Sequence, residues 1–151
     1  MRKILYVDMD NVLVDFTTSF TRVPQELLAK FEGRLDEVPG IFSQMDPMPH
    51  AIECFNELAT LFDTYILSTS PWENPSAWSD KLLWVKRHLG ERAYKRLILT
   101  HHKNLNHGDY LVDDRLNNGV DRFSGQHIHF GSWQFPDWLV VRQYLRQKVT
   151  Q

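Results

Sequence analysis

Near the start of the chain, residues 4–16 read ILYVDMDNVLVDF, in which a short apolar run, Ile4–Val7, is followed at once by Asp8 and Asp10. An apolar run without alternation is typical of a strand that is covered on both faces. In an extended chain, residues two apart point to the same side, so Asp8 and Asp10 are expected to face one pocket. The stretch therefore predicts a strand of an α/β sheet that ends in a pair of carboxylates.

The same alternation of strand and helix continues along the chain. Four more short apolar runs follow, at Tyr65–Leu67, Leu97–Leu99, Tyr110–Val112 and His127–Phe130. Three stretches between or after them carry apolar residues at helical spacing. Their stripes are Ile52, Phe55, Ala59 and Phe62; Trp78, Leu82, Val85 and Leu89; and Trp138, Val141 and Leu145. Ser76 is a plausible N-cap for the second helix, and Gly90 a plausible stop. The pattern predicts a three-layer α/β fold with a parallel sheet.

Residues 16–47 interrupt this rhythm. The segment is rich in Phe and is punctuated by Pro39-Gly40, and one helix is expected near Gln25–Phe31. We interpret residues 16–47 as a small cap insertion after the first strand, within a single domain that spans residues 1–151.

Polar side chains follow four consecutive apolar runs. They are Asp8 and Asp10; Ser68, Thr69 and Ser70; Thr100 to Lys103; and Asp113 and Asp114. Each set alone is common at a turn. Ligands of open α/β sheets bind outside the carboxyl ends of the strands, so all four sets are expected at one rim. Their combination indicates a catalytic site.

The carboxylates predict a metal ion. Asp8, Asp10, Asp113 and Asp114 would repel one another unless a cation were bound or some stayed protonated. Mg²⁺ suits oxygen ligands and bridges carboxylates to a substrate phosphate. Zinc usually requires His or Cys, and the nearby pair His101-His102 leaves zinc open.

The same residues suit phosphoryl transfer, in which positioning and charge stabilisation dominate catalysis. Asp8 is placed to act as a carboxylate nucleophile. Asp10 would protonate the leaving oxygen and then activate the water that hydrolyses the intermediate. Lys103 would supply positive charge, and Thr69 and Ser70 hydrogen bonds, to the phosphate oxygens.

These motifs resemble those of haloacid dehalogenase (HAD) superfamily phosphatases, in the correct order from Asp8 to Asp114. Asp8–Phe16, Thr69-Ser70-Pro71 and Asp113-Asp114-Arg115 more closely resemble segments of the 5'(3')-deoxyribonucleotidases. The resemblance implies a HAD-like, Rossmann-type fold and supports Asp8 as nucleophile and Asp10 as acid/base.

The resemblance also implies further contacts. Asp10 would offer its backbone carbonyl to Mg²⁺, Lys81 would be a second basic phosphate contact, and Phe16 would pack against the nucleobase. Asn11 replaces the usual Gly, but Asn tolerates a left-handed backbone. The cap is shorter than in the animal enzymes, and because the cap reads the substrate, this difference bears on nucleotide specificity.

Composition limits the classes of partner. The 151 residues carry a formal net charge of −2, which does not suggest a binder of nucleic-acid polymers. Cys54 is the single cysteine, and no apolar stretch approaches the roughly 20 residues of a membrane span. We therefore expect a cytoplasmic enzyme with a small phosphorylated substrate, a nucleotide in particular. A homodimer is compatible with the sequence, although no pattern supports one.

The predicted activity is that of a Mg²⁺-dependent phosphomonoesterase for (deoxy)nucleoside monophosphates. One alternative is a HAD phosphatase for another small phosphoester, such as a sugar phosphate. A second is a non-catalytic phosphoacceptor or binding protein, although a phosphoacceptor has no need of a general acid such as Asp10. The sequence leaves open the base and sugar preference, the 5' or 3' position, and which of Asp113 and Asp114 contacts the metal.

Overall fold

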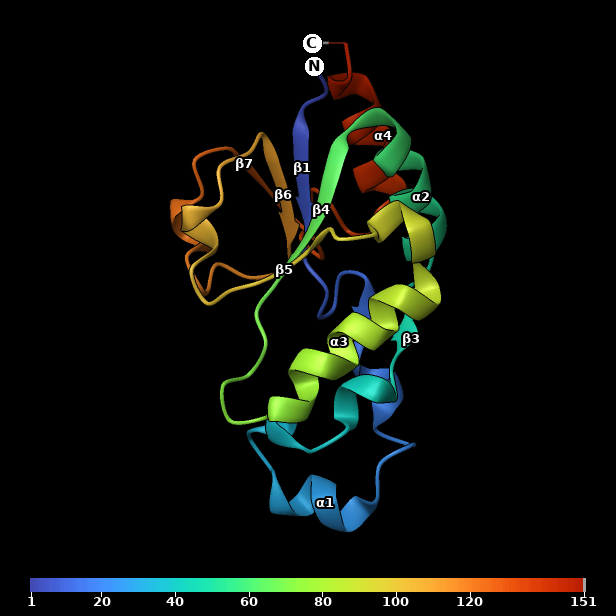
Figure 1. Cartoon of the computed structure of the whole chain (residues 1–151), viewed down its shortest axis with the longest axis vertical. Coiled ribbons are helices and arrows are strands. Elements are labelled where there is room, and N and C mark those ends of the chain that lie inside the picture. Colours follow the sequence, from blue (N-terminus) through green and yellow to red (C-terminus); the bar gives the residue numbers. More distant parts are fainter. Residues whose placement is uncertain (151) are drawn as a thin grey trace.

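A five-stranded parallel sheet forms the centre of the computed structural model, which describes residues 1–150 (Figure 1). The strands lie in the order β5-β4-β1-β6-β7. Their bounds are Ile4–Val7 for β1, Asp63–Ser68 for β4, Leu97–Leu99 for β5, Tyr110–Asp113 for β6 and Gln126–His129 for β7. The predicted parallel α/β fold is confirmed. Because β1 is central, its carboxyl end lies between those of β4 and β6.

One face of the sheet is covered by α2 (Ala51–Leu61) and α4 (Trp138–Lys148), which lie side by side in Figure 1. Leu5 and Val7 of β1 point into this main core, whereas Tyr6 points to the other face, as strand geometry requires. Trp138 is fully buried, and its indole nitrogen donates to the carbonyl of Val12 at 2.7 Å. This bond fixes α4 against the loop that follows β1.

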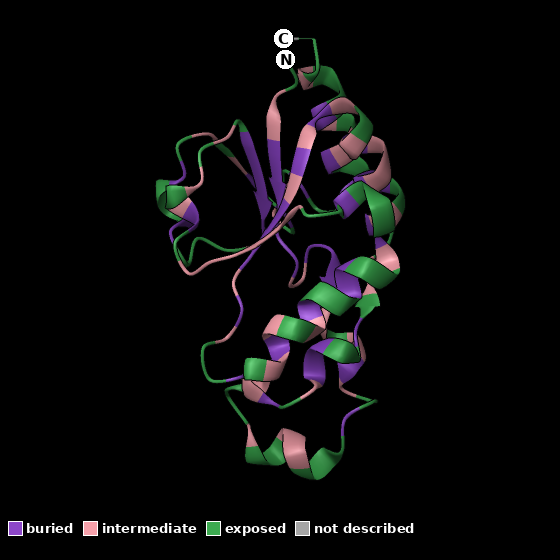
Figure 2. Cartoon of the chain, viewed as in Figure 1, coloured by how far each residue is buried: buried purple, intermediate pink, exposed green. Residues whose placement is uncertain are grey.

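The opposite face has a thinner cover. Tyr6, Leu67 and Leu111 pack there against Val120 and Phe123, which belong to or follow the 3₁₀ helix η6 (Val120–Arg122). The third layer is thus built from short helical turns and loops between β6 and β7. In Figure 2 the central strands are mostly buried, which agrees with apolar residues on both of their faces.

Residues 16–47 lie beyond the carboxyl end of the sheet (Figure 1). A short antiparallel ladder between β2 (Val14–Asp15) and β3 (Asp46–Pro47) closes the base of this segment. The helix expected near Gln25–Phe31 is present as α1 (Gln25–Lys30), and none of its residues is buried. The segment also holds three 3₁₀ helices, η1 (Phe16–Ser19), η2 (Leu35–Glu37) and η3 (Ile41–Ser43).

Helix α3 (Pro75–His88) connects residues 16–47 to the sheet, and two expectations about it were wrong. Asn74, not Ser76, is the N-cap residue, and the Ser76 hydroxyl instead accepts the backbone N–H of Gly40 at 3.0 Å. Leu82 is 43% exposed, whereas Lys81 is fully buried. Tertiary contacts override the apolar stripe here, because α3 turns its buried face toward 3₁₀ helix η3 as well as toward the sheet.

The remaining short 3₁₀ helices are η4 (Gly90–Ala93), which follows α3, and η5 (Lys103–Leu105), which follows β5. Within residues 1–150, no helix has the length and apolar character needed to cross a bilayer.

Candidate active site

A cavity of about 690 Å³ opens at the carboxyl end of the sheet, between the strands and residues 16–47. The sheet side contributes the candidate residues Asp8, Asp10, Thr69, Lys103, Asp113 and Asp114 to its lining. Residues 16–47 contribute Phe16 and the stretch from Gly33 to Glu37. Residues that are far apart in the sequence therefore meet at the rim where the strand order predicts a ligand.

Three carboxylates meet at the bottom of this cavity. Asp8, Asp113 and Asp114 each offer an oxygen, and these oxygens lie within 4.8 Å of one another. Burial, and then the charge of Asp8, raises the pKa of both Asp113 and Asp114 above the ordinary range. The cluster therefore holds its negative charge only at a cost in free energy, which a bound cation would offset.

Lys103 lies between two of these carboxylates. Its Nζ is 3.0 Å from Oδ1 of Asp8 and 2.6 Å from Oδ2 of Asp113, and the side chain is almost fully buried. Burial lowers the pKa of Lys103, but the charges of Asp8 and Asp113 outweigh burial and raise the pKa. The ammonium group therefore stays charged beside Asp8.

Two histidines hold the loop that carries Asp113 and Asp114. Nε2 of His127 lies 2.8 Å from the backbone carbonyl oxygen of Asp113, and Nε2 of His129 lies 3.0 Å from that of Asp114. Both histidines belong to β7, which pairs with β6 and places His129 opposite Asp113. Both contacts orient the acidic loop.

The loop that carries Asp10 turns at Asn11, whose φ of 59° is left-handed. The Asn11 side-chain oxygen also accepts the backbone N–H of Phe16 at 3.3 Å. Asn11 thus adopts the left-handed conformation expected of it from the sequence, and its side chain stabilises the start of the next segment.

Lys81 has no exposed surface and does not line the cavity. Its Nζ donates to Oδ2 of Asp10 at 3.2 Å, to the Ser68 hydroxyl at 2.9 Å and to the Thr69 carbonyl at 2.6 Å. Burial raises the pKa of Asp10, the charge of Lys81 opposes this shift, and the charge of Asp8 adds to it. Oδ1 of Asp10 is buried without a hydrogen-bond partner.

The four residues predicted to bind phosphate therefore do not all face the cavity. Thr69 and Lys103 line the cavity, and the Thr69 hydroxyl donates to the Thr100 carbonyl at 2.7 Å. Ser70 is fully buried, its hydroxyl oxygen has no partner within residues 1–150, and it does not line the cavity.

Sequence reasoning missed several cavity residues. Arg34, Asp36 and Glu37 come from residues 16–47, and Arg34 is paired with Glu37 at 2.8 Å. Trp72 and His101 also line the cavity, and their ring centres lie 5.9 Å apart. Both belong to or directly follow motifs that the sequence places at this rim, Thr69-Ser70-Pro71 and Thr100 to Lys103, so their position agrees with the sequence.

The donor set of the acidic cluster suits a hard cation. In the part of the chain that the structure describes, the group able to hold a metal ion consists of three aspartates and contains neither His nor Cys. Carboxylate oxygens alone favour Mg²⁺ over zinc. The residues present thus fit the ion predicted from the sequence.

Comparison with known proteins agrees with this geometry. The family described as 5' nucleotidase, deoxy (pyrimidine), cytosolic type C matches residues 31–135. A putative 5'(3')-deoxyribonucleotidase of Vibrio phage KVP40 is 56% identical over 144 residues, covering 95% of this chain and 85% of the relative. The human cytosolic-type 5'(3')-deoxyribonucleotidase is 32% identical over 138 residues, covering 72% and 69%.

The fold has its own relatives among solved structures. A haloacid dehalogenase-like hydrolase from Xanthomonas campestris superposes with a TM-score of 0.61 at 10% identity, covering 99% of this chain and 97% of that one. Together with the sequence matches, this similarity shows that the chain belongs to the 5'(3')-deoxyribonucleotidase family of HAD-like phosphatases.

Proposed function

We propose that this chain is a Mg²⁺-dependent phosphatase of nucleoside monophosphates, with deoxyribonucleotides preferred, and that it acts through an aspartyl-phosphate on Asp8. The observation that carries the proposal is the position of Asp8. Its carboxylate lies in the lining of the cavity, next to Lys103 and within the three-aspartate cluster.

The first half-reaction begins when a carboxylate oxygen of Asp8 attacks the phosphorus atom. The bond from phosphorus to the ester oxygen breaks, and Asp10 donates a proton to that oxygen, so the nucleoside leaves as an alcohol. Burial favours the protonated form of Asp10, as the raised pKa of this carboxyl indicates. The unpartnered Oδ1 is the atom that we assign to proton transfer.

The second half-reaction reverses the role of Asp10. The Asp10 carboxylate accepts a proton from water, the water oxygen bonds to phosphorus, and the bond to Asp8 breaks. Inorganic phosphate leaves, and Asp10 is again protonated.

Asp8, Asp113 and Asp114 would hold Mg²⁺, together with the backbone carbonyl of Asp10. The bound ion would supply positive charge against the phosphate oxygens and lessen the repulsion among the carboxylates. Lys103 adds a second positive charge on the same side of the cavity.

Lys81 and Ser70 take revised roles in this proposal. Because Lys81 is fully buried and donates to Asp10, we assign it the positioning of Asp10 rather than contact with phosphate. Ser70 remains a candidate phosphate ligand through its unpartnered hydroxyl, provided that the loop shifts when substrate binds.

Residues 16–47 act as the cap that selects the substrate. Phe16 lines the cavity, and we assign its ring to contact with a nucleobase, while Arg34 and Trp72 lie along the same cavity. The names of the relatives support deoxyribonucleotides as the substrate class. A cytoplasmic location is part of the proposal, since Cys54 is buried and its thiol is free.

The test is phosphate release with Mg²⁺ and with EDTA. The panel contains dUMP, dTMP, UMP, AMP, a sugar phosphate and an aryl phosphate. Asp8→Asn should abolish turnover. Asp121→Asn is the matched control, because Asp121 is an exposed carboxylate that does not line the cavity. Turnover of the sugar or aryl phosphate alone would support the phosphatase mechanism and refute the nucleotide assignment. No turnover on any substrate would refute the enzyme.

A further inference from the structure

A second cavity, of about 330 Å³, lies at the opposite end of the sheet from the active site. Its lining includes Asp63, the first residue of β4, whereas Ser68 at the other end of this six-residue strand contacts Lys81. An extended strand rises about 3.3 Å per residue, so roughly 17–20 Å separates the two sites. The second cavity is therefore independent of the catalytic residues.

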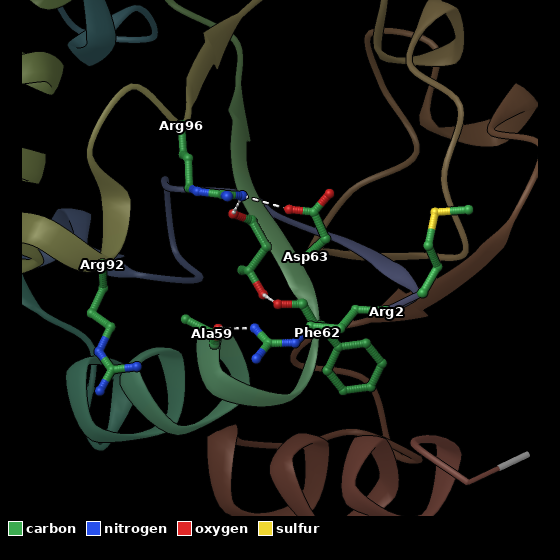
Figure 3. A pocket seen from close by; sticks show the side chains of 8 residues that line it. Arg2, Ala59, Phe62, Asp63, Arg92 and Arg96 are labelled. Atoms are coloured by element: carbon green, nitrogen blue, oxygen red, sulfur yellow. Dashed lines mark hydrogen bonds and ion pairs between the residues drawn. The ribbon is translucent and has the colours of Figure 1, made fainter.

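Three arginines from separate parts of the chain meet around this cavity (Figure 3). Arg2 precedes β1, Arg92 belongs to η4, and Arg96 precedes β5. Figure 3 shows Arg2 reaching toward the end of α2, with Arg96 and Arg92 on other sides of the same space.

Only one of the three positive charges is balanced by a carboxylate. Arg96 donates to Oδ1 of Asp63 at 2.6 Å and to the Thr64 carbonyl at 3.2 Å. Asp63 is the single acidic residue in the lining, and because it is paired with Arg96, no carboxylate of the lining is left to balance Arg2 or Arg92. The remaining charges of Arg2 and Arg92 stand out in a chain whose formal net charge is −2.

The two remaining guanidinium groups are available to a ligand. Arg2 makes one long hydrogen bond, at 3.4 Å, to the Ala59 carbonyl, which leaves its charge without a counter-ion. The Arg92 side chain is exposed and forms no hydrogen bond or ion pair with any residue in the described range 1–150. Most exposed arginines simply point into solvent, but these two border one concave space beside a third.

We propose that this cavity binds a small anion that carries two or more phosphate groups. Guanidinium groups match phosphate oxygens in geometry and bind them through paired, charge-assisted hydrogen bonds. Two uncompensated arginines on different elements suit two linked phosphates better than a single carboxylate. The volume lies at the low end for small-molecule pockets, which suits an oligophosphate rather than a polymer.

Tripolyphosphate is the probe for the test, and the readout is a ¹H–¹⁵N NMR titration of the whole chain. The backbone amides of Thr64, Arg92 and Arg96 should shift together and saturate, at a concentration distinct from any shift near Asp8 or Thr69. Because the readout is local, it separates this site from the active site and does not depend on the proposed function.

Arg92→Gln should weaken binding at these amides about ten-fold or more, as expected for loss of charge-assisted hydrogen bonds. The fold should be unaffected, since the Arg92 side chain has no hydrogen-bond or ion-pair partner within residues 1–150 to lose. Arg122→Gln removes the same charge from the exposed end of η6 and should leave the affinity unchanged. Shifts confined to active-site amides would overturn the proposal, as would equal weakening by both variants, which would mean diffuse attraction.

Discussion

The ammonium nitrogen of Lys81 lies 3.2 Å from Oδ2 of Asp10, and the whole lysine side chain is shielded from solvent. The same nitrogen donates to the Ser68 hydroxyl and the Thr69 carbonyl. Lys81 therefore ties helix α3 to the ends of β1 and β4. This arrangement fits a residue that orients the general acid, and it leaves little of the amine for substrate.

Lys81→Met should lower kcat by about ten-fold or more and leave KM for a nucleotide nearly unchanged, because Asp10 loses its orientation. It should also reduce the free energy of unfolding by about 2–4 kcal/mol, since one buried and two partly buried acceptors lose their donor. Steady-state kinetics and thermal unfolding measure the two effects. Lys86→Met on the exposed face of the same helix is the control. A raised KM with normal kcat would restore the phosphate-binding role.

The burial of Lys81 could not be predicted from the apolar pattern of its helix. Its neighbours Trp78, Leu82 and Val85 suggest an apolar stripe that excludes Lys81, yet Leu82 is exposed and Lys81 is buried. A helical stripe identifies the buried face only when the helix has one partner. Helix α3 contacts both the sheet and 3₁₀ helix η3, and the sequence does not reveal this second partner.

Asp114→Asn should stabilise the metal-free protein at pH 8 by about 2–4 °C in Tm, the shift expected for roughly 1 kcal/mol in a chain of this size. The reason is repulsion, because burial and the charge of Asp8 raise the pKa of Asp114. Differential scanning fluorimetry in EDTA measures the shift, with Asp121→Asn as the control.

The sign follows from proton linkage. A raised pKa means that the folded protein holds the proton of Asp114 more tightly than the unfolded chain does, so stability in EDTA falls as pH rises above about 4. The gain from Asp114→Asn should thus vanish near pH 4. Mg²⁺ should raise the Tm of the wild type more than that of the variant. Equal Mg²⁺ effects on both proteins would remove Asp114 from the metal site.

Phe16→Ala should lower kcat/KM for dUMP about ten-fold and leave an aryl phosphate nearly unaffected, because base stacking on an aromatic ring is lost. Phe20→Ala is a matched control, since Phe20 packs against Phe16, with ring centres 5.9 Å apart, but does not line the cavity. The two variants are compared on both substrates. Equal losses on dUMP and the aryl phosphate would make Phe16 a packing residue.

Asn74→Ala should loosen residues 16–47. The Asn74 amide donates to the backbone carbonyls of Asp36 at 2.9 Å and Val38 at 3.0 Å, and it is almost fully buried. The free energy of unfolding should fall by about 1–3 kcal/mol, and KM for dUMP should rise more than KM for the aryl phosphate. Asn74→Asp keeps the size of the side chain but loses the amide donor, so it should have the same effects on stability and KM as Asn74→Ala. A stable variant with unchanged KM values would show that these bonds do not hold the cap.

The parts of the fold that depend on local pattern were predictable. The strand runs Ile4–Val7 and Leu97–Leu99 were confirmed at both ends, because buried parallel strands are continuous apolar runs. The strand order could not be predicted, since no local feature places β1 between β4 and β6. The ladder between Val14–Asp15 and Asp46–Pro47 was also missed, because two-residue strands carry no periodicity.

Detection of a phosphorylated Asp8 is the most direct test of the central claim. The protein is mixed with dUMP and Mg²⁺, quenched in acid, reduced with borohydride and digested with trypsin. Mass spectrometry of the peptide spanning residues 4–22 should then find homoserine at position 8, formed from an aspartyl-phosphate, and should find none in Asp8→Asn. Active protein without modification, or with the modification at Asp10, would contradict Asp8 as the nucleophile.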